Sequence, residues 1–178
     1  MRVGSREEVF TFTPVALATL PSLGSLSPAT RIRIPAIDLV SSVETLALLN
    51  HRGYWLFSIP KEFVGQVPTT GNPGEGARGW YMAHQSDVFE HLPEIVHLIL
   101  EGKPVDVILE TEKEAYLYRV SGRPVIVPTS EFDGGYFHAN LYAPDPEIVF
   151  TTCVPPKKWD YRLLVTARLV GRGSNGGG

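Results

Sequence analysis

Short apolar runs separated by Pro- and Gly-rich turns constrain the fold of this 178-residue chain more than any other feature. The runs alternate apolar with polar residues, or concentrate β-branched and aromatic residues, as β-strands do. Examples are RIRIP, YWLFSI, PVDVILET, AYLYRVSG, RPVIVP, EIVFTTC and YRLLVTARLV, with turn clusters such as NPGEG, SGRP and APDPE between them. This pattern predicts a mainly β domain that closes as a barrel or a sandwich.

One segment, residues 87–102, has the apolar spacing of a helix. Pro93 lies inside it, so we expect two short helical turns rather than one long helix. We interpret residues 1–30 as an N-terminal arm or linker, because their second half is rich in Pro, Ser, Ala and Leu without a sustained period. We assign the folded domain to residues 31–171 and a flexible Gly-rich tail to residues 172–178.

The composition argues against several classes of protein. The formal net charge is −3, whereas nucleic-acid-binding domains usually carry a basic excess, so we expect no nucleic-acid partner. A single cysteine excludes an internal disulfide framework and a Cys-rich zinc site. No stretch approaches the roughly 20 apolar residues of a transmembrane helix. We therefore expect either a cytosolic protein or one whose membrane anchor is missing from this sequence.

The single cysteine, Cys153, ends the apolar run 147–153 and directly precedes Val-Pro-Pro. A lone cysteine is often a buried small hydrophobe. It can also be a nucleophile, which requires a base or a charged partner because the thiolate is the attacking species. Strand ends next to loops are where a rigid scaffold presents reactive groups, and this position favours the second interpretation.

Histidines are the candidates for that base, and the chain has five: His51, His84, His91, His97 and His138. His84 is the strongest candidate because it follows the apolar run GWYMA and so also lies at a strand end. His138 lies in a loop that contains Gly and Tyr and could line a cleft. His91 and His97 fall on the helical segment and His51 in a turn, where surface or packing roles are expected.

Arg162 opens the last apolar run, on the far side of the Pro-Pro loop from Cys153. Two successive antiparallel strands bring their adjacent ends together, so we expect Arg162 to lie beside Cys153. A fixed cation there can donate to an oxyanion that develops during acyl transfer. Arg168 has the same parity on the strand but lies roughly 20 Å away at ~3.3 Å per residue, so it does not suit this role.

The pattern Thr-Cys-x-Pro, followed by a strand Arg-Leu-x-Val, resembles the sortases, which are cysteine transpeptidases of bacterial surfaces. Residues 149–153, VFTTC, keep the Thr and Cys of the family signature Thr-Leu-x-Thr-Cys but replace its first Thr and its Leu. The stretch MAHQSD matches the family's Ala-Gly-His-Arg without the glycine before His84. The stretch RIRIPAIDLV resembles the first strand and Ile-Pro turn of a sortase, so the resemblance covers residues 31–171.

This resemblance implies a closed eight-stranded sortase β-barrel with one or two short helices. It implies that Cys153 is the nucleophile, His84 the acid and base, and Arg162 the residue that orients substrate and stabilises the oxyanion. The implied reaction cleaves a C-terminal sorting signal resembling Leu-Pro-x-Thr-Gly through a thioacyl-enzyme. An amine, such as a cell-wall precursor or a pilin lysine, then takes the acyl group. The implied location is the extracytoplasmic face of the bacterial membrane, reached through an N-terminal anchor missing from this sequence.

The resemblance also places the substrate groove beside residues 128–146, which precede the strand that ends in Cys153. We expect five residues to contribute to substrate binding, with core or strand packing as the open alternative for each: Thr151, Thr152, Val125, Val127 and His138. The segment VPPKKWDY after Cys153 is expected to wall the active site.

We expect no cofactor and a monomeric protein. The alternating Glu110, Glu112 and Glu114 would suit a calcium site of the kind found in some sortases, but solvated carboxylates explain this pattern more simply. Two other functions stay open: a cysteine peptidase with water as the acceptor, and a non-catalytic β-barrel module that binds peptides or assists pilus assembly. Papain-like proteases are disfavoured because in them the cysteine precedes the histidine, whereas here His84 comes first.

Overall fold

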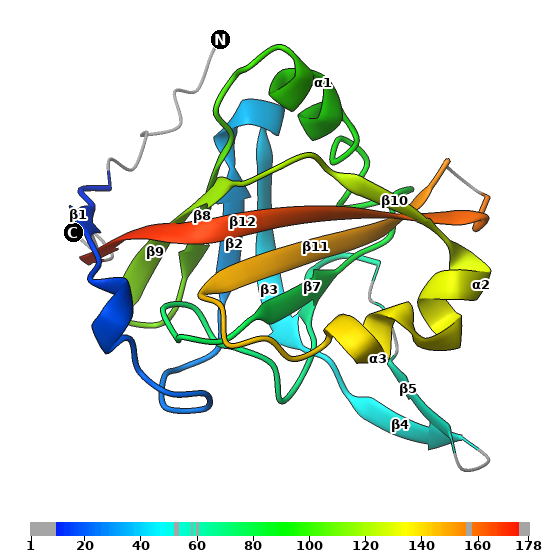
Figure 1. Ribbon diagram of the computed structural model, residues 1–178, viewed down its shortest axis with the longest axis horizontal. Helices are drawn as coiled ribbons and strands as arrows, with labels where there is room; N and C mark the ends of the chain where they lie inside the picture. The colour runs from blue at the N-terminus through cyan, green and yellow to red at the C-terminus, as the bar shows by residue number, and fades with distance from the viewer. Residues whose placement is uncertain (1–9, 52–53, 58, 60, 156–157, 175–178) are drawn as a thin grey trace, which may run out of the picture.

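The computed structural model describes residues 10–51, 54–57, 59, 61–155 and 158–174, and for the strands between residues 48 and 57 it describes the backbone alone. Eight of the described strands form a closed barrel, in which β9 pairs back onto β12 and completes the ring (Figure 1). In order around the barrel they are β12 (Tyr161–Ser174), β11 (Glu147–Val154), β7 (Gly79–Met82), β6 (Val64–Gln66), β3 (Leu39–Thr45), β2 (Arg31–Ile34), β8 (Asp106–Glu110) and β9 (Glu114–Val120). The predicted closed eight-stranded barrel is confirmed.

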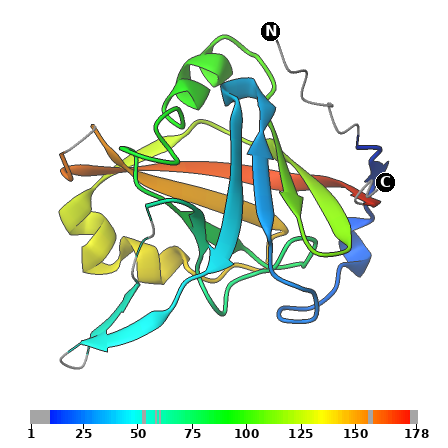
Figure 2. The same cartoon turned by 180° about the vertical axis from the view of Figure 1, so that it is seen from behind.

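Four further strands lie outside this ring. β1 (Thr13–Pro14) and β10 (Val125–Pro128) each pair with β12. β4 (Leu48–His51) and β5 (Tyr54–Phe57) form a separate hairpin that projects from the barrel (Figure 1). Seen from behind, β2, β3, β8 and β9 form the wall opposite β7, β11 and β12 (Figure 2). The strand patterns in the sequence did not predict β1, β3, β4 or β6.

Short helices surround the barrel (Figure 1). α1 (Glu94–Leu100) begins directly after Pro93, and turns occupy residues 85–93, so the expected break at Pro93 is confirmed. A second helical segment joins β10 to β11, where the sequence indicated only a loop over residues 128–146, and that expectation is wrong. This segment comprises α2 (Thr129–Glu131), η3 (Phe132–Tyr136) and α3 (Phe137–Asn140). η3 is a π-helical stretch, whereas η1 (Leu17–Thr19) and η2 (Pro35–Ile37) are single turns of 3-10 helix.

Two apolar clusters hold the domain together. The larger cluster fills the barrel, and its buried members include Ile32, Tyr81, Phe89, Phe150 and Val165. The second cluster lies on the outer side of the sheet, between the strands and the helical segment, and includes Trp80, Val127, Phe132, Phe137 and Leu164. Phe137 packs edge-on against Trp80 with ring centroids 5.1 Å apart. These aromatic contacts hold the helical segment against the outer face of the sheet.

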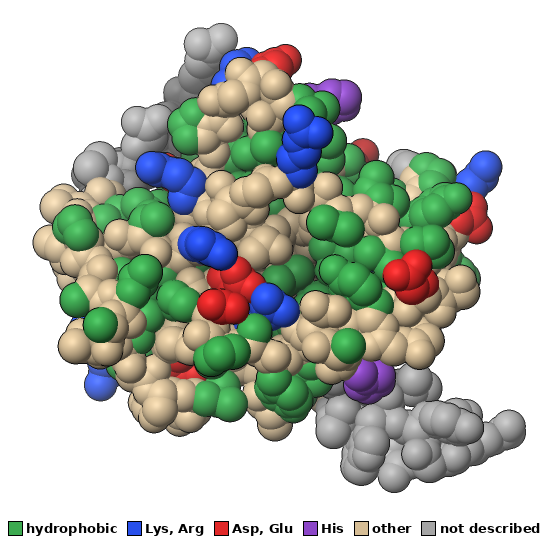
Figure 3. Space-filling model, in the orientation of Figure 1, with side chains coloured by type: hydrophobic (Ala, Val, Ile, Leu, Met, Phe, Trp, Pro, Cys, Tyr) green, Lys and Arg blue, Asp and Glu red, His purple; other side chains and the backbone are tan. Residues whose placement is uncertain are grey.

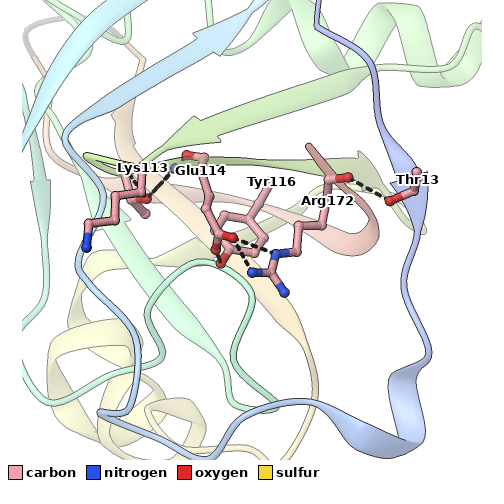
Figure 4. Close-up of polar contacts among 6 residues, drawn as sticks. Thr13, Lys113, Glu114, Tyr116 and Arg172 are labelled. Atoms are coloured by element: carbon pink, nitrogen blue, oxygen red, sulfur yellow. Dashed lines mark hydrogen bonds and ion pairs between the residues drawn. The ribbon is translucent and has the colours of Figure 1, made fainter. Parts of the chain in front are cut away.

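Residues 172–174 belong to β12 and not to a flexible tail, which corrects the predicted boundary. They pair with β9 across the seam that closes the barrel, and Arg172 lies opposite Thr13 of β1. At this seam the Arg172 guanidinium donates to the Glu114 carboxylate, which also accepts a hydrogen bond from the Tyr116 hydroxyl (Figure 4). Backbone pairing of this kind leaves no signal in a Gly-rich composition, so the sequence did not predict it.

Residues 10–30 are largely exposed but are attached to the barrel at several points. The buried Glu75 carboxylate accepts hydrogen bonds from the backbone N–H groups of Gly24, at 3.0 Å, and Leu26, at 2.8 Å. Leu20 packs against the barrel core. A buried carboxylate is costly unless it is hydrogen-bonded, and these bonds therefore tie the arm to the body.

Candidate active site

The strands β11 and β12 bring the predicted nucleophile and cation together. Cys153 lies directly opposite Arg162 in the antiparallel register of these two strands. The Nη1 atom of Arg162 donates a hydrogen bond to the Cys153 sulfur at 3.1 Å. The prediction that Arg162 lies beside Cys153 is confirmed, because β11 and β12 are successive antiparallel strands whose register pairs these two residues.

Side chains of β11 alternate between the inside and the outside of the barrel, as in any strand. Ile148 and Phe150 belong to the barrel core, whereas Val149 belongs to the outer cluster. Cys153 shares the parity of Val149, so its thiol lies on the outer face. Thr152 has the opposite parity and is 3% exposed, and its hydroxyl donates to the Ala83 carbonyl at 2.8 Å. Thr152 therefore ties β11 to β7 and does not line an open groove, contrary to the prediction.

His84 follows β7, the strand that runs parallel to β11. Met82 is paired with Thr151, and the Thr152–Ala83 hydrogen bond continues this alignment by one residue. His84 and Cys153 are the next residues on each chain, so they occupy the same end of the sheet. The His84 ring is half-buried, and its Nε2 atom lies 3.2 Å from the Ile59 carbonyl oxygen. Among the described residues, the hydrogen bond of this ring goes to Ile59 rather than to the thiol.

Arg162 is held by two residues of the helical segment as well as by Cys153. Its Nη1 atom donates to the Thr129 hydroxyl at 3.0 Å, and its guanidinium carbon lies 5.8 Å from the centroid of the Phe132 ring. Hydroxyl and aromatic contacts satisfy the guanidinium without neutralising its charge. The site therefore presents a cation whose charge is not cancelled by these neighbours.

The electrostatics of the thiol reflect three influences. Burial raises the pKa of Cys153 above its ordinary value, the Arg162 charge lowers it, and the Asp133 carboxylate raises it again. Burial is the largest influence because a half-buried thiolate loses part of its hydration. Burial and Asp133 therefore favour the thiol form of Cys153, and Arg162 is the group that favours the thiolate.

The predicted substrate-binding residues fall into different environments. Val127 lies opposite Arg162 in the β10–β12 register but is only 4% exposed, beneath the helical segment. Val125 has the same parity and is 47% exposed. Thr151 shares the outer face with Cys153, yet it is buried, and its hydroxyl has no hydrogen-bond partner among the described residues. His138 lies exposed on α3, with its ring packed against Phe137.

Sequence reasoning missed Thr129, Phe132 and Asp133, which surround the guanidinium and the thiol. The apolar residues of their segment do recur at helical spacing, at Phe132, Tyr136, Phe137 and Leu141. The intervening Asp-Gly-Gly, typical of a turn, hides that period. Gly135 indeed interrupts the helical backbone with a φ of 153°.

The other predicted features can be placed only in part. Of the expected wall after Cys153, residues 156–157 lie outside the described residues, as does the side chain of His51. Trp159 is 72% exposed. The carboxylate of Glu110 binds Arg33 and that of Glu114 binds Arg172. Within the described ranges, no cluster of three His, Cys, Asp or Glu side chains is placed to hold a metal ion.

Comparison with known families identifies the chain. The family model for the sortase domain matches residues 32–170. The chain belongs to the sortase family. It is a cysteine transpeptidase, and the single cysteine of the sequence lies at the site described above. No curated protein shows a significant match to the chain.

Solved sortase structures share the fold at low sequence identity. A lid mutant of sortase A from Corynebacterium diphtheriae is 20% identical, with a TM-score of 0.55, over 83% of this chain and 73% of that one. Sortase C-3 from Streptococcus pneumoniae is 18% identical, with a TM-score of 0.59, over 85% and 67% of the two chains. Sortase E1 from Streptomyces coelicolor, solved with a tripeptide in its active site, is 16% identical, with a TM-score of 0.56, over 86% and 94%.

In the part of the chain that the structure describes, no helix has the length and apolar character needed to span a membrane.

Proposed function

We propose that this sortase cleaves a C-terminal sorting signal resembling Leu-Pro-x-Thr-Gly on surface proteins. We further propose that it transfers the acyl group to an amine, such as a cell-wall precursor or a pilin lysine, at the extracytoplasmic face of an anchoring membrane. The observation that supports this reading most strongly is the 3.1 Å contact between Arg162 Nη1 and Cys153 Sγ. This contact keeps a permanent cation against the single thiol of the chain, where it can stabilise a thiolate and a developing oxyanion.

In the first half-reaction, the Cys153 thiolate attacks the carbonyl carbon of the Thr–Gly bond, and the carbonyl oxygen becomes an oxyanion. Arg162 donates to this oxyanion, because a guanidinium in contact with Sγ also reaches an oxygen on the carbon bonded to Sγ. The carbon–nitrogen bond then breaks, and protonated His84 gives its proton to the departing glycine amine. The product is a thioester between Cys153 and the threonine carbonyl.

In the second half-reaction, the acceptor amine attacks this thioester. His84, now neutral, takes the proton that the amine loses as the new carbon–nitrogen bond forms. The carbon–sulfur bond breaks, and the Cys153 thiolate is released beside Arg162. Both steps are acyl transfers without a change of oxidation state, so neither step needs a redox cofactor.

An apolar surface beside the site supports an extended peptide as the substrate. Figure 3 shows apolar side chains gathered over β10 and the start of β12. Four large apolar residues on or near these strands are well exposed. Val125, at 47%, shares the outer face with Arg162, and Trp159, at 72%, lies just before β12, whereas Ile126 at 59% and Tyr161 at 45% project from the other face of the strands. Exposed apolar patches of this kind commonly mark binding surfaces, and the Leu-Pro part of a sorting signal has matching chemistry.

A panel of peptides tests the proposal. Each peptide carries a variant of Leu-Pro-x-Thr-Gly and is incubated with the protein, with and without an amine such as triglycine, and the products are identified by mass spectrometry. The expected product with amine joins the peptide, cut after Thr, to the acceptor, and it is absent with Cys153→Ala.

Two results would contradict the proposal. Release of the free acid alone at saturating amine would indicate a peptidase with water as the acceptor. If no peptide of the panel gave a product that depends on Cys153, the proposed sorting-signal specificity would be wrong.

A further inference from the structure

Thr129 connects three parts of the active site through two hydrogen bonds of its hydroxyl and one of its backbone. It is the first residue of α2 and directly follows Pro128, which pairs with Tyr161 at the start of β12. Its backbone N–H donates to the Asp160 carbonyl at 2.8 Å. Thr129 therefore joins the helical segment to the β11–β12 connection next to Cys153.

The direction of the hydroxyl bonds follows from the donors and acceptors available. A hydroxyl has one hydrogen to donate and lone pairs to accept with. The Trp159 carbonyl can only accept, so the Thr129 hydroxyl donates its hydrogen there. The guanidinium of Arg162 can only donate, so it binds a lone pair of the same oxygen at 3.0 Å. The Trp159 carbonyl thus orients the lone pair of Thr129 toward the arginine.

A single nitrogen of Arg162 carries both contacts of interest. Nη1 donates one hydrogen to the Thr129 hydroxyl at 3.0 Å and the other to the Cys153 sulfur at 3.1 Å. Arginine side chains have many rotamers, and a half-buried arginine needs restraint to keep one of them. The Phe132 ring limits movement of the guanidinium on one face, but an aromatic face has no directional acceptor for an individual N–H.

We infer that Thr129 is a positioning residue, whose hydroxyl holds the Arg162 guanidinium against the thiol of Cys153. The inference rests on the role proposed above for Arg162. The charged groups that act on the thiol come from separate elements: Arg162 from β12 and Asp133 from η3, with His84 at the same end of the sheet. Thr129 contacts only Arg162 among these groups, so removal of its hydroxyl weakens the stabilisation of the thiolate by the Arg162 charge.

The single cysteine allows a direct test on the whole protein. Alkylation of Cys153 by iodoacetamide is followed by intact mass across the neutral and alkaline pH range. Thr129→Val keeps the shape of the side chain and the backbone bond to Asp160 but removes the hydroxyl. We expect its alkylation midpoint to move to higher pH and its rate at neutral pH to fall roughly tenfold, because hydrogen bonds to charged groups are the stronger kind.

Three matched variants separate positioning from folding. Thr129→Ser keeps the hydroxyl, and we expect it to restore the parent profile. Ser130→Ala removes the exposed hydroxyl one residue later, and we expect no shift. Thr129→Val added to Arg162→Gln should shift the profile no further than Arg162→Gln alone. Thr129→Ala replaces Thr129→Val if the latter loses the parent circular dichroism spectrum.

The outcomes distinguish this inference from the proposed function. An unchanged profile in Thr129→Val, with a shifted one in Arg162→Gln, would overturn the inference and leave the role of Arg162 intact. An equal shift from Thr129→Val with and without Arg162 would overturn it too, because the effect would not run through the arginine. An unchanged profile in Arg162→Gln would overturn both the inference and the proposed role of Arg162.

Discussion

The two ends of β12 use the same residue type in opposite ways. At the barrel seam, Arg172 donates to the Glu114 carboxylate (Figure 4). Partway along the strand, Arg168 lies 3.8 Å from the Glu147 carboxylate. At the active-site end, the polar partners of Arg162 among the described residues are the Thr129 hydroxyl and the Cys153 thiol. Two arginines of this strand are paired with acids, whereas Arg162 forms no ion pair with the carboxylates of the described residues.

This difference shows how one strand serves both stability and chemistry. When a guanidinium is paired with a carboxylate, the carboxylate charge offsets its electrostatic potential, so the pair stabilises a developing negative charge only weakly. A guanidinium held only by neutral groups is desolvated without the compensating attraction of an ion pair, which costs more free energy. It can, however, stabilise an oxyanion that exists only during the reaction. The predictions below compare the two ends, from the largest expected effect to the smallest.

Removal of the proposed acid and base should have the largest effect. We expect His84→Ala to lower kcat/KM for sorting-signal peptides roughly a thousandfold, because general acid–base catalysis contributes on that scale. His97→Ala is the matched control, since His97 is exposed on α1 and has no role in the proposed site, and it should stay near parent activity. Activity retained in His84→Ala and lost in His138→Ala would exchange their roles.

Replacement of each arginine by lysine should separate the two ends of β12. We expect Arg162→Lys to lower kcat/KM roughly a hundredfold, because lysine keeps the charge but lacks the planar fork that contacts Thr129 and Cys153 together. Arg172→Lys should remain close to the parent in the same peptide assay. Near-normal turnover in Arg162→Lys would remove the oxyanion role assigned to this arginine.

The part of the site that the sequence could predict is the part built by strand pairing. Alternating apolar runs on both sides of a short Pro-containing connection indicate two antiparallel strands, and such strands bring Cys153 and Arg162 together. Parity along β11 could also have placed Thr152 inside the barrel, because Ile148 and Phe150 are strongly apolar. The motif resemblance drew attention to Thr152 instead, and the groove assignment was wrong.

The helical segment over the site could not be predicted in the same way. Its folding depends on contacts distant in sequence, such as the packing of Phe137 on Trp80. The local sequence around Asp133 favours a turn, so the tertiary contacts override it. Thr129 and Phe132 were missed for this reason. The pairing of residues 172–174 with β9 was missed because register at a barrel seam depends on the closure of the whole sheet.

The pH dependence of Cys153 alkylation should report the electrostatics at the active-site end of β12. Burial raises the pKa of Cys153, with the Arg162 charge opposing it. The thiolate therefore forms above the ordinary thiol range of about 8.5. We expect the alkylation rate of Cys153 to keep rising with pH through that value, and Arg162→Gln should move the rise to still higher pH. A plateau already complete at neutral pH would contradict this electrostatic description.

The contribution of the barrel seam to the free energy of unfolding should fall at acid pH, and we expect this effect to be the smallest. Burial raises the pKa of Glu114, but hydrogen bonds from Arg172 and Tyr116 outweigh it and leave the pKa below its ordinary value. A lowered carboxyl pKa stabilises the fold above its unfolded value of about 4.3, and that contribution is lost as pH falls. We expect Arg172→Gln to reduce the free energy of unfolding by at most about 1 kcal/mol at neutral pH, since the pair is partly exposed.

Urea unfolding of the parent and of Arg172→Gln at several pH values checks this prediction. The difference between the two proteins should shrink as the pH falls through the acid range. A difference that persists unchanged at low pH would show that the arginine acts through packing rather than through its pairing with Glu114.

The central claim is that Cys153 beside Arg162 forms the acyl-transfer centre. Its most direct test is intact-mass measurement of the protein with an intact sorting-signal peptide, whose Thr–Gly bond is uncleaved, and no added amine. We predict a covalent adduct on Cys153 with the mass of the peptide up to its threonine, which disappears when amine is added and accumulates far more slowly in Arg162→Gln. Peptide cleavage by Cys153→Ala, or turnover by the parent through an adduct on another residue, would contradict the claim.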